Sequence, residues 1–166
     1  DDEQIQLYAA NYKAKLTYHL NEIKISEHTW ANYILGVANE FVERGYAISG
    51  FNLYLYGDVP LGAGLSSSAA VECAVALALS HINQLSVDRL ELALMSQKAE
   101  HTFAGVNCGI MDQFSSVHGL ENKVIKLDCK TLEFEYHEAN FNNHKIIVDN
   151  LDLNIRTPPQ QIMISL

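Results

Sequence analysis

The sequence predicts an α+β fold for this chain of 166 residues. Apolar residues recur at helical spacing in several segments, short runs alternate between polar and apolar residues, and turns rich in glycine, serine or asparagine separate them. Hydrophobic residues make up 48% of the chain and charged residues 19%, which is typical of a globular domain with a buried core. Disorder is therefore not expected.

The first third of the chain predicts a strand, a helix and a second strand. Tyr12–Leu20 alternates loosely and is interpreted as a strand. Trp30–Val42 places its apolar side chains three and four residues apart, which predicts an amphipathic helix. Phe51–Tyr56 alternates again, with its large apolar residues on one side. A glycine-rich turn, Gly57–Gly64, follows this strand.

The remainder of the chain predicts three helices and three further strands. The first helix opens at a serine cluster and ends near His81. Ser86-Val87-Asp88 is a typical helix start, so a second helix is expected from Arg89 to about His101. A short helix is expected at Met111–Val117, and strands at Lys123–Leu127, Phe134–Tyr136 and Lys145–Val148.

Composition excludes several classes of protein. The net charge of −9 argues against a general nucleic-acid binder, which carries a basic surface. The longest apolar stretch, Ala69–Leu79, is too short to span a membrane. Three distant cysteines, Cys73, Cys108 and Cys129, favour reduced thiols and a cytoplasmic protein. The histidines form no HExxH motif, so no histidine metal site is expected. The oligomeric state stays open.

Pro60–Ala70, with the sequence P-L-G-A-G-L-S-S-S-A-A, is the most informative segment. Glycines let backbone N–H groups approach an anion closely, and a helix start adds unpaired N–H groups and the positive end of its dipole. A strand, a glycine turn and a helix start in this order therefore predict a phosphate-binding loop. The alternative is a glycine turn with a serine cap on a buried helix, but one cap needs only one serine.

This loop is not a Walker A motif, because no Gly-Lys-Ser/Thr sequence occurs in it. Residues 51–97 contain no lysine, so that segment has no lysine to neutralise bound phosphates. A Mg²⁺ ion held by a serine hydroxyl and a carboxylate would supply the missing positive charge.

The same segment resembles the second motif, P-x-x-x-G-L-S-S-S-A, of the GHMP kinases, a superfamily of small-molecule kinases. Two further segments resemble galactokinases within it: W-A-N-Y-I-L-G-V at Trp30–Val37 and A-E-H-T-F-A-G-V-N-C-G-I-M-D-Q-F at Ala99–Phe114. Leu127–Leu132, L-D-C-K-T-L, is similar to the galactokinase segment I-D-C-R-S-L. Order and spacing agree over roughly residues 9–149.

The resemblance implies a GHMP kinase N-terminal domain over residues 1–150, with a mostly antiparallel sheet backed by helices. It also implies the activity of the family, the ATP- and Mg²⁺-dependent phosphorylation of galactose at its anomeric hydroxyl. Three alternatives remain open. They are an N-acetylgalactosamine kinase, a galactokinase-like sensor that binds sugar and ATP but regulates transcription, and a truncated product without activity.

The resemblance also assigns roles to individual residues. Asp112 is implied in catalysis, Ser68 and Glu100 in Mg²⁺ binding, and Cys108 and Gly109, with Asp112, in sugar binding. Trp30 and Tyr33 are implied to line the adenine pocket. The residues implied to bind the ATP phosphates are Gly62, Ala63, Gly64, Leu65, Ser66, Ser67 and Ser68.

Each assignment has a structural alternative when the residue is taken alone. Asp112 would cap the short helix, and Glu100 would be a solvated charge. Trp30 and Tyr33 would be core residues, and Cys108 a small buried one. The joint pattern, in order and at family spacing, favours the functional interpretation.

Two parts of the family pattern are missing from this sequence. The first family motif, which carries an arginine and sugar contacts, would precede Asp1, and the third would follow Leu166. We therefore expect the chain to be incomplete and inactive by itself. Residues 151–166 also depart from the family, and a reading-frame slip near Asn150–Asp152 would explain the change. Genomic sequence across this point tests that hypothesis.

Overall fold

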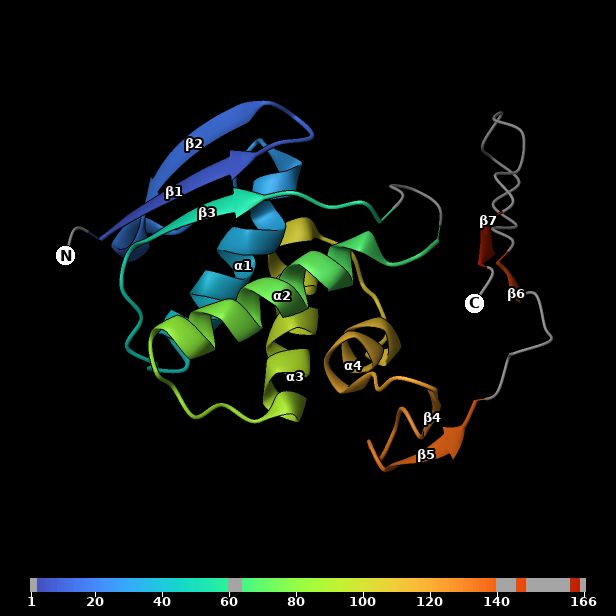
Figure 1. Ribbon diagram of the computed structural model, residues 1–166. Coiled ribbons are helices and arrows are strands. Elements are labelled where there is room, and N and C mark those ends of the chain that lie inside the picture. The colour runs from blue at the N-terminus through green and yellow to red at the C-terminus, as the bar shows by residue number, and fades with distance from the viewer. Residues whose placement is uncertain (1–2, 60–63, 140–145, 149–161, 165–166) are drawn as a thin grey trace. The chain divides into compact units, whose positions relative to one another are not determined.

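The computed structural model describes residues 3–59, 64–139, 146–148 and 162–164 (Figure 1). Chain contacts divide the molecule into two compact units, one of residues 1–58 with 68–118 and one of residues 59–67 with 119–166. The elements, in chain order, are β1 (Gln4–Ala9), β2 (Ala14–His19), η1 (Leu20–Glu22), α1 (Thr29–Glu43), β3 (Phe51–Leu55), α2 (Ser67–Ile82), α3 (Arg89–Ala99), η2 (Glu100–Ala104), α4 (Met111–His118), β4 (Lys123–Leu127), β5 (Phe134–Glu138), β6 (Ile146–Val148) and β7 (Ile162–Ile164).

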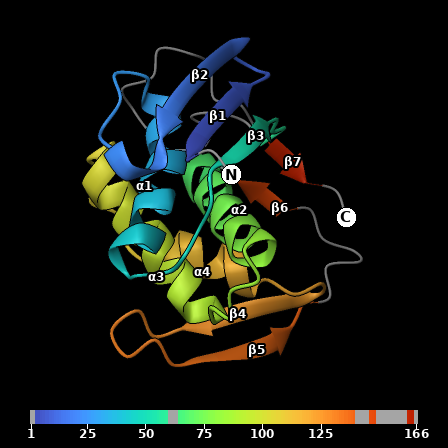
Figure 2. The ribbon, with the colours of Figure 1, turned by 90° about the vertical axis from the view of Figure 1, so that its left-hand side faces the viewer.

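The first unit is a three-stranded sheet covered on one face by helices (Figures 1 and 2). The strand order is β2-β1-β3, with β1 antiparallel to β2 and parallel to β3. The parallel pair needs a long connection, which α1 supplies on the covered face. The sheet and α1 therefore form the base on which α2 and α3 pack.

The core of this unit lies between the sheet and the helices. Ile5 and Leu7 project from β1 into it and are fully buried. They meet buried apolar side chains of α1, α2 and α3, namely Ala31, Ile34, Leu35, Val37, Ala38, Phe41, Val75, Ala76, Leu79, Leu92, Met95 and Ala99. This burial fixes three helices against one sheet face. Helices α1 and α2 carry candidate site residues, and α3 continues into Glu100.

The second unit contains two antiparallel strand pairs. Strand β4 pairs with β5, from Lys123 opposite Glu138 to Leu127 opposite Phe134. Strand β6 pairs with β7, so that Ile147 stands opposite Met163. The other residues of the divergent tail, 151–161 and 165–166, lie outside the described residues, and its assignment as an aberrant segment stays a prediction.

The α+β class is confirmed. Among the described strands, three pairings are antiparallel and one is parallel, and they are divided among three small sheets. The predicted helix starts agree well with the structure. Helix α3 begins at Arg89 because the Asp88 carboxylate accepts a hydrogen bond from the backbone N–H of Glu91 at 2.9 Å. Within the described residues, no helix is both long and apolar enough to cross a membrane.

Candidate functional site

The described part of the predicted phosphate loop turns sharply before α2. Gly64 and Ser66 both have left-handed backbone conformations, with φ of 71° and 51°. A serine in this conformation costs about 1 kcal/mol. Turns of this kind let successive N–H groups gather around an anion. Gly62 and Ala63 lie outside the described residues, so their roles stay predictions.

Helix capping does not account for this serine cluster. Helix α2 begins at Ser67, so Ser66 occupies the cap position, where an extended backbone rather than φ of 51° is usual. Ser68 is already in the first helical turn, and its hydroxyl has no hydrogen-bond partner among the described residues. The Ser68 hydroxyl is therefore available to a ligand.

Four segments of the first unit meet at a buried polar cluster. Its members are Glu72 of α2, Glu100 of η2, Cys108 of the following loop and Gln113 of α4, and we name it the acid network. Glu72 and Gln113 are 0% exposed and Glu100 is 5% exposed. The Gln113 side-chain nitrogen, Nε2, donates to Glu100 Oε2 at 2.6 Å and to Glu72 Oε2 at 3.2 Å. Two buried carboxyl groups thus share one amide donor.

The two carboxyl groups differ in their surroundings. Burial, and secondarily the nearby Glu100, raises the pKa of Glu72 to about 8, although the hydrogen bond from Gln113 acts in the opposite direction. Glu72 therefore holds its proton at neutral pH. A buried carboxyl group inside an apolar helix is expensive unless it is neutral or hydrogen-bonded, and here it is both.

Among the described residues, only one of the two carboxylate oxygens of Glu100 accepts hydrogen bonds. Its Oε2 accepts from Gln113 and, at 3.1 Å, from the Cys108 thiol. Among the described residues, no hydrogen bond reaches Oε1. The alternative that Glu100 is a solvated charge is wrong, because the side chain is buried. Glu100 opens the π-helical turn η2, a distortion that is frequent at functional sites.

Cys108 is fixed at its backbone and at its thiol. Its carbonyl oxygen lies 3.1 Å from Gln97 Nε2, which donates to it, and 2.9 Å from His101 Nε2. Burial and then the contact with Glu100 raise the pKa of the thiol to about 11, so Cys108 is a hydrogen-bond donor and not a nucleophile. A side chain added at Gly109 would meet nothing within 4 Å. Packing among the described residues does not require that glycine.

Asp112 lies in the first turn of α4 and is half-buried. The capping alternative for it is not supported, because the first helical hydrogen bond runs from the Phe114 N–H to the Ile110 carbonyl, which puts Ile110 at the cap. The Asp112 carboxylate has no hydrogen bond or ion pair among the described residues. No described residue therefore competes with a ligand for this carboxylate.

The two predicted adenine-pocket residues have different neighbours. Trp30 packs partly on the core, and its ring stacks on Tyr12 with the centroids 6.1 Å apart. Tyr33 is half-buried, and burial followed by the charges of Glu100 and Glu72 raises its pKa. Tyr33 is therefore within electrostatic influence of the acid network. Trp30 forms an aromatic surface with Tyr12.

The sequence prediction missed four residues of this region. Glu72 was detectable as the one charged residue in the apolar stretch Ala69–Leu79, and Gln113 lies within the quoted motif. No sequence pattern indicated that Tyr12 would lie in this region. Asn32 acts structurally, because its side chain accepts from the Ser26 N–H at 2.7 Å and donates to the Ser26 carbonyl at 2.9 Å. That double hydrogen bond fixes the approach to α1.

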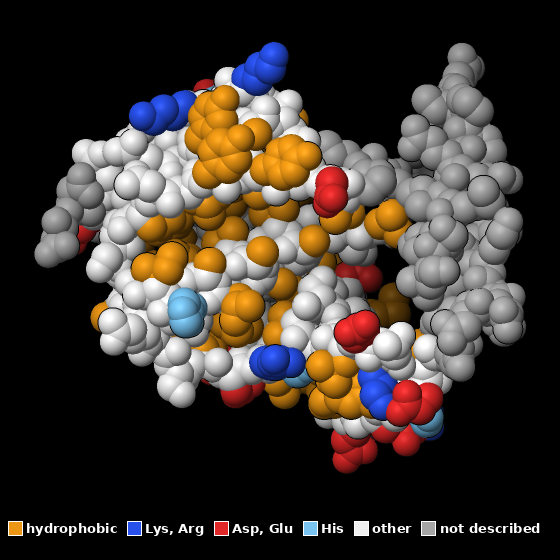
Figure 3. Space-filling model, in the orientation of Figure 1, with side chains coloured by type: hydrophobic (Ala, Val, Ile, Leu, Met, Phe, Trp, Pro, Cys, Tyr) orange, Lys and Arg blue, Asp and Glu red, His pale blue; other side chains and the backbone are white. Residues whose placement is uncertain are grey.

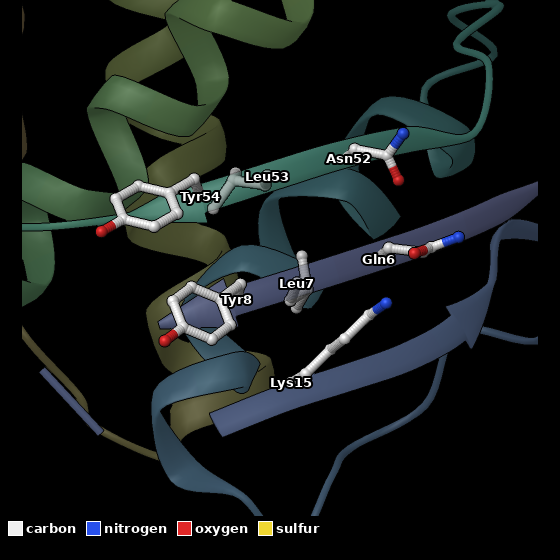
Figure 4. A pocket seen from close by; sticks show the side chains of 7 residues that line it. All are labelled: Gln6, Leu7, Tyr8, Lys15, Asn52, Leu53 and Tyr54. Carbon is white, nitrogen blue, oxygen red and sulfur yellow. The ribbon is translucent and has the colours of Figure 1, made fainter. Parts of the chain in front are cut away.

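A shallow depression on the uncovered face of the sheet is a separate feature (Figure 4). Tyr8 and Tyr54 lie side by side in it, with ring centroids 5.4 Å apart, and apolar side chains are visible over this part of the surface (Figures 3 and 4). The residues lining it are Gln6, Leu7, Tyr8, Lys15, Asn52, Leu53 and Tyr54. No residue predicted from the sequence to bind a ligand is among them.

The oxygens of the first unit fit Mg²⁺ bound together with a nucleotide. The described residues hold no group of three or more His, Cys, Asp or Glu side chains that forms a metal cage. Mg²⁺ does not need one, because it commonly binds through one or two carboxylates, substrate phosphates and water. Ser68 Oγ and Glu100 Oε1 are hard oxygen atoms without hydrogen-bond partners among the described residues. This donor set suits Mg²⁺ better than a thiophilic metal.

Comparisons with known proteins point in one direction. The family model described as GHMP kinases N terminal domain matches residues 32–120. The chain is 40% identical over 151 residues to a galactokinase of Clostridium tetani, covering 90% of this chain and 38% of the relative. It is 41% identical over 134 residues to a galactokinase of Pyrococcus furiosus, covering 81% of this chain and 38% of that relative. The chain thus spans about two fifths of the length of these relatives.

Solved structures agree on the fold. A crystal structure of Lactococcus lactis galactokinase complexed with galactose matches with a TM-score of 0.84 and 36% identity, covering 89% of this chain and 39% of that one. A Methanococcus jannaschii mevalonate kinase matches with a TM-score of 0.67 at 18% identity, covering 86% of this chain and 46% of that one, which supports the fold alone.

Proposed function

Because the chain belongs to the GHMP kinase family, we propose that a full-length protein containing it transfers the γ-phosphoryl group of ATP to the anomeric hydroxyl of galactose. The proposal depends most on two adjacent residues of α4, Asp112 and Gln113. Asp112 presents a carboxylate without a partner among the described residues, and Gln113 holds Glu100 in place at 2.6 Å. Likeness to galactokinases over about nine tenths of this chain supports galactose as the substrate.

The phosphates of ATP are assigned to the segment from Gly62 to Ser68. The left-handed turns at Gly64 and Ser66 and the start of α2 offer backbone N–H groups and the positive end of a helix dipole. Ser68 and Glu100 would hold the metal ion. That ion would neutralise the phosphate charge that no lysine of this segment neutralises.

Asp112 is assigned as the general base. It accepts the proton of the sugar hydroxyl as that oxygen forms a bond to the γ-phosphorus, and ADP leaves with the electrons of the broken bond. Its half-buried carboxylate, which has no partner among the described residues, suits this role. A cation near Asp112 would stabilise the developing negative charge.

The substrate contacts are assigned to the loop before α4 and to α1. Cys108 and Gly109 would lie beside the sugar, where a glycine that packing does not require leaves space for a ligand. Trp30 and Tyr33 would line the adenine pocket. Trp30 offers the larger aromatic surface, and Tyr33 would border the phosphate end, because it interacts with Glu72 and Glu100.

The proposal is tested by product analysis with the full-length protein. ATP and Mg²⁺ are supplied with either galactose or N-acetylgalactosamine, and products are separated by mass spectrometry. We expect galactose 1-phosphate and ADP in equal amounts. Preference for N-acetylgalactosamine would change the assigned substrate, and binding of galactose and ATP without ADP release would favour a sensor.

A further inference from the structure

Gln113 is the only member of the acid network that contacts all of the others. Besides its bonds to Glu100 and Glu72, its Nε2 lies 3.6 Å from the Cys108 sulfur. Its own backbone carbonyl accepts from the Cys73 thiol of α2 at 3.5 Å. One buried residue of α4 therefore contacts α2, η2 and the loop between η2 and α4.

The chemistry at this position is demanding. Both acceptor oxygens belong to carboxyl groups, so the residue between them must present two hydrogens from one atom. A glutamine amide does so without adding a charge to a buried site. An apolar side chain of the same volume would fill the space but leave Glu72 and Glu100 without that donor.

We propose that Gln113 is a positioning residue that holds Glu100 Oε2, so that Oε1 stays directed to the metal ion, and that ties Glu100 to the helix carrying Asp112. The proposal rests on the proposed function and extends it, because Gln113 acts through Glu100.

A purely structural role would have different consequences. If Gln113 only filled space and stabilised α4, replacing it would lower the unfolding midpoint and the fraction of active protein. The magnesium concentration that supports half-maximal activity would not change. Residues that orient metal ligands instead alter metal affinity, typically by about 10- to 100-fold.

The test uses Gln113→Met, which keeps the volume and removes the donor, in the full-length protein. We expect the Mg²⁺ concentration for half-maximal ADP release to rise at least about tenfold. Calorimetric titration of ATP at a series of Mg²⁺ concentrations, without sugar, should show the same shift. Gln6→Met on the sheet face is the matched control, because it makes the same change at a half-buried glutamine remote in sequence and absent from the network.

A second variant guards against misfolding. Gln113→Asn keeps the amide but shortens it by one methylene, so its nitrogen falls short of Glu100, and the same magnesium shift is expected. Unchanged magnesium dependence in both assays, with either folded variant, overturns the proposal. A wild type that binds Mg²⁺-ATP without phosphorylating galactose contradicts the proposed substrate alone, and the binding assay still decides the role of Gln113. A wild type without magnesium-dependent ATP binding contradicts both proposals.

Discussion

Gly36 of α1 and Ala99 of α3 approach so closely that a Cβ built on Gly36 would stand 3.0 Å from the Ala99 Cβ and 3.1 Å from the Ala99 carbonyl oxygen. The Phe103 Cβ would be equally close, at 3.0 Å. None of these three atoms can rotate away, because each is backbone or directly attached to it. The glycine of the W-A-N-Y-I-L-G-V motif thus allows α1 to pack against the turn that carries Glu100.

Gly36→Ala should therefore lower the free energy of unfolding. Alanine gains about 1 kcal/mol over glycine in a helix, whereas overpacking costs about 1–3 kcal/mol. With no side chain able to move, we expect overpacking to win by about 1 kcal/mol. Urea unfolding of the full-length protein measures the change. Gly57→Ala, where an added Cβ meets nothing within 4 Å, is the control. A higher free energy of unfolding for Gly36→Ala would mean that α1 and α3 can move apart at little energetic cost.

Glu72 predicts a pH dependence of stability. Its folded-state pKa of about 8 lies above the ordinary value of 4.5, so between those values the folded protein keeps a proton that the unfolded chain has released. The contribution of Glu72 to stability is complete below about pH 4.5 and falls as the pH rises towards 8, by at most about 1.4 kcal/mol per pH unit.

Glu72→Gln replaces the titrating carboxyl group with an amide. The free energy of unfolding of the variant should therefore depend less on pH. We expect the urea midpoint of the variant to rise relative to that of the wild type as the pH is raised from 5 to 8. Both proteins are measured at the same ionic strength. Profiles that run parallel across this range would show that Glu72 is ionised in the folded protein.

Helices and their starts were predictable because local chemistry determines them. Asp88 caps α3 through one short-range hydrogen bond, and the 3.6-residue period of α1 is plain in the sequence. Strand β1 was missed although Ile5 and Leu7 alternate there, because the strand is only six residues long and Ala9 is a weak signal. The pairing of β1 with β3 depends on tertiary packing and has no local signature.

Within the candidate site, the resemblance assigned roles to Glu100 and Asp112 but did not indicate what surrounds them. The hydrogen bond between Gln113 and Glu100 spans a loop, and the contact of Gln113 with Glu72 joins residues far apart in sequence. Neither follows from spacing. The burial of Glu100 was likewise not evident, because a glutamate beside a histidine at a helix end is usually solvated.

Ser68→Ala tests the assigned magnesium ligand. Removing the hydroxyl should lower turnover on the order of 100-fold, since the lost contact acts where charge develops in the transition state. The Michaelis constant for galactose should change little. Steady-state kinetics at saturating Mg²⁺ measure both values, with Ser67→Ala as the neighbouring comparison. Turnover near that of the wild type would leave Ser68 with a structural role only.

Gly109→Ala separates a sugar contact from a packing role. The added methyl group meets nothing within 4 Å among the described residues, so the fold should tolerate it. If the sugar lies there, the methyl group should raise the Michaelis constant for galactose about tenfold or more while ATP binding is retained. Kinetics with galactose varied at fixed ATP provide the measurement. An unchanged constant would place the sugar elsewhere.

The general base is the central claim, and Asp112→Asn tests it most directly. The substitution keeps the size of the side chain and removes its charge, so the fold and the binding of ATP should be retained. Galactose-dependent ADP release by the full-length protein should fall at least about 100-fold, the scale of general-base catalysis. A loss of less than about threefold in a folded, ATP-binding variant would contradict the account.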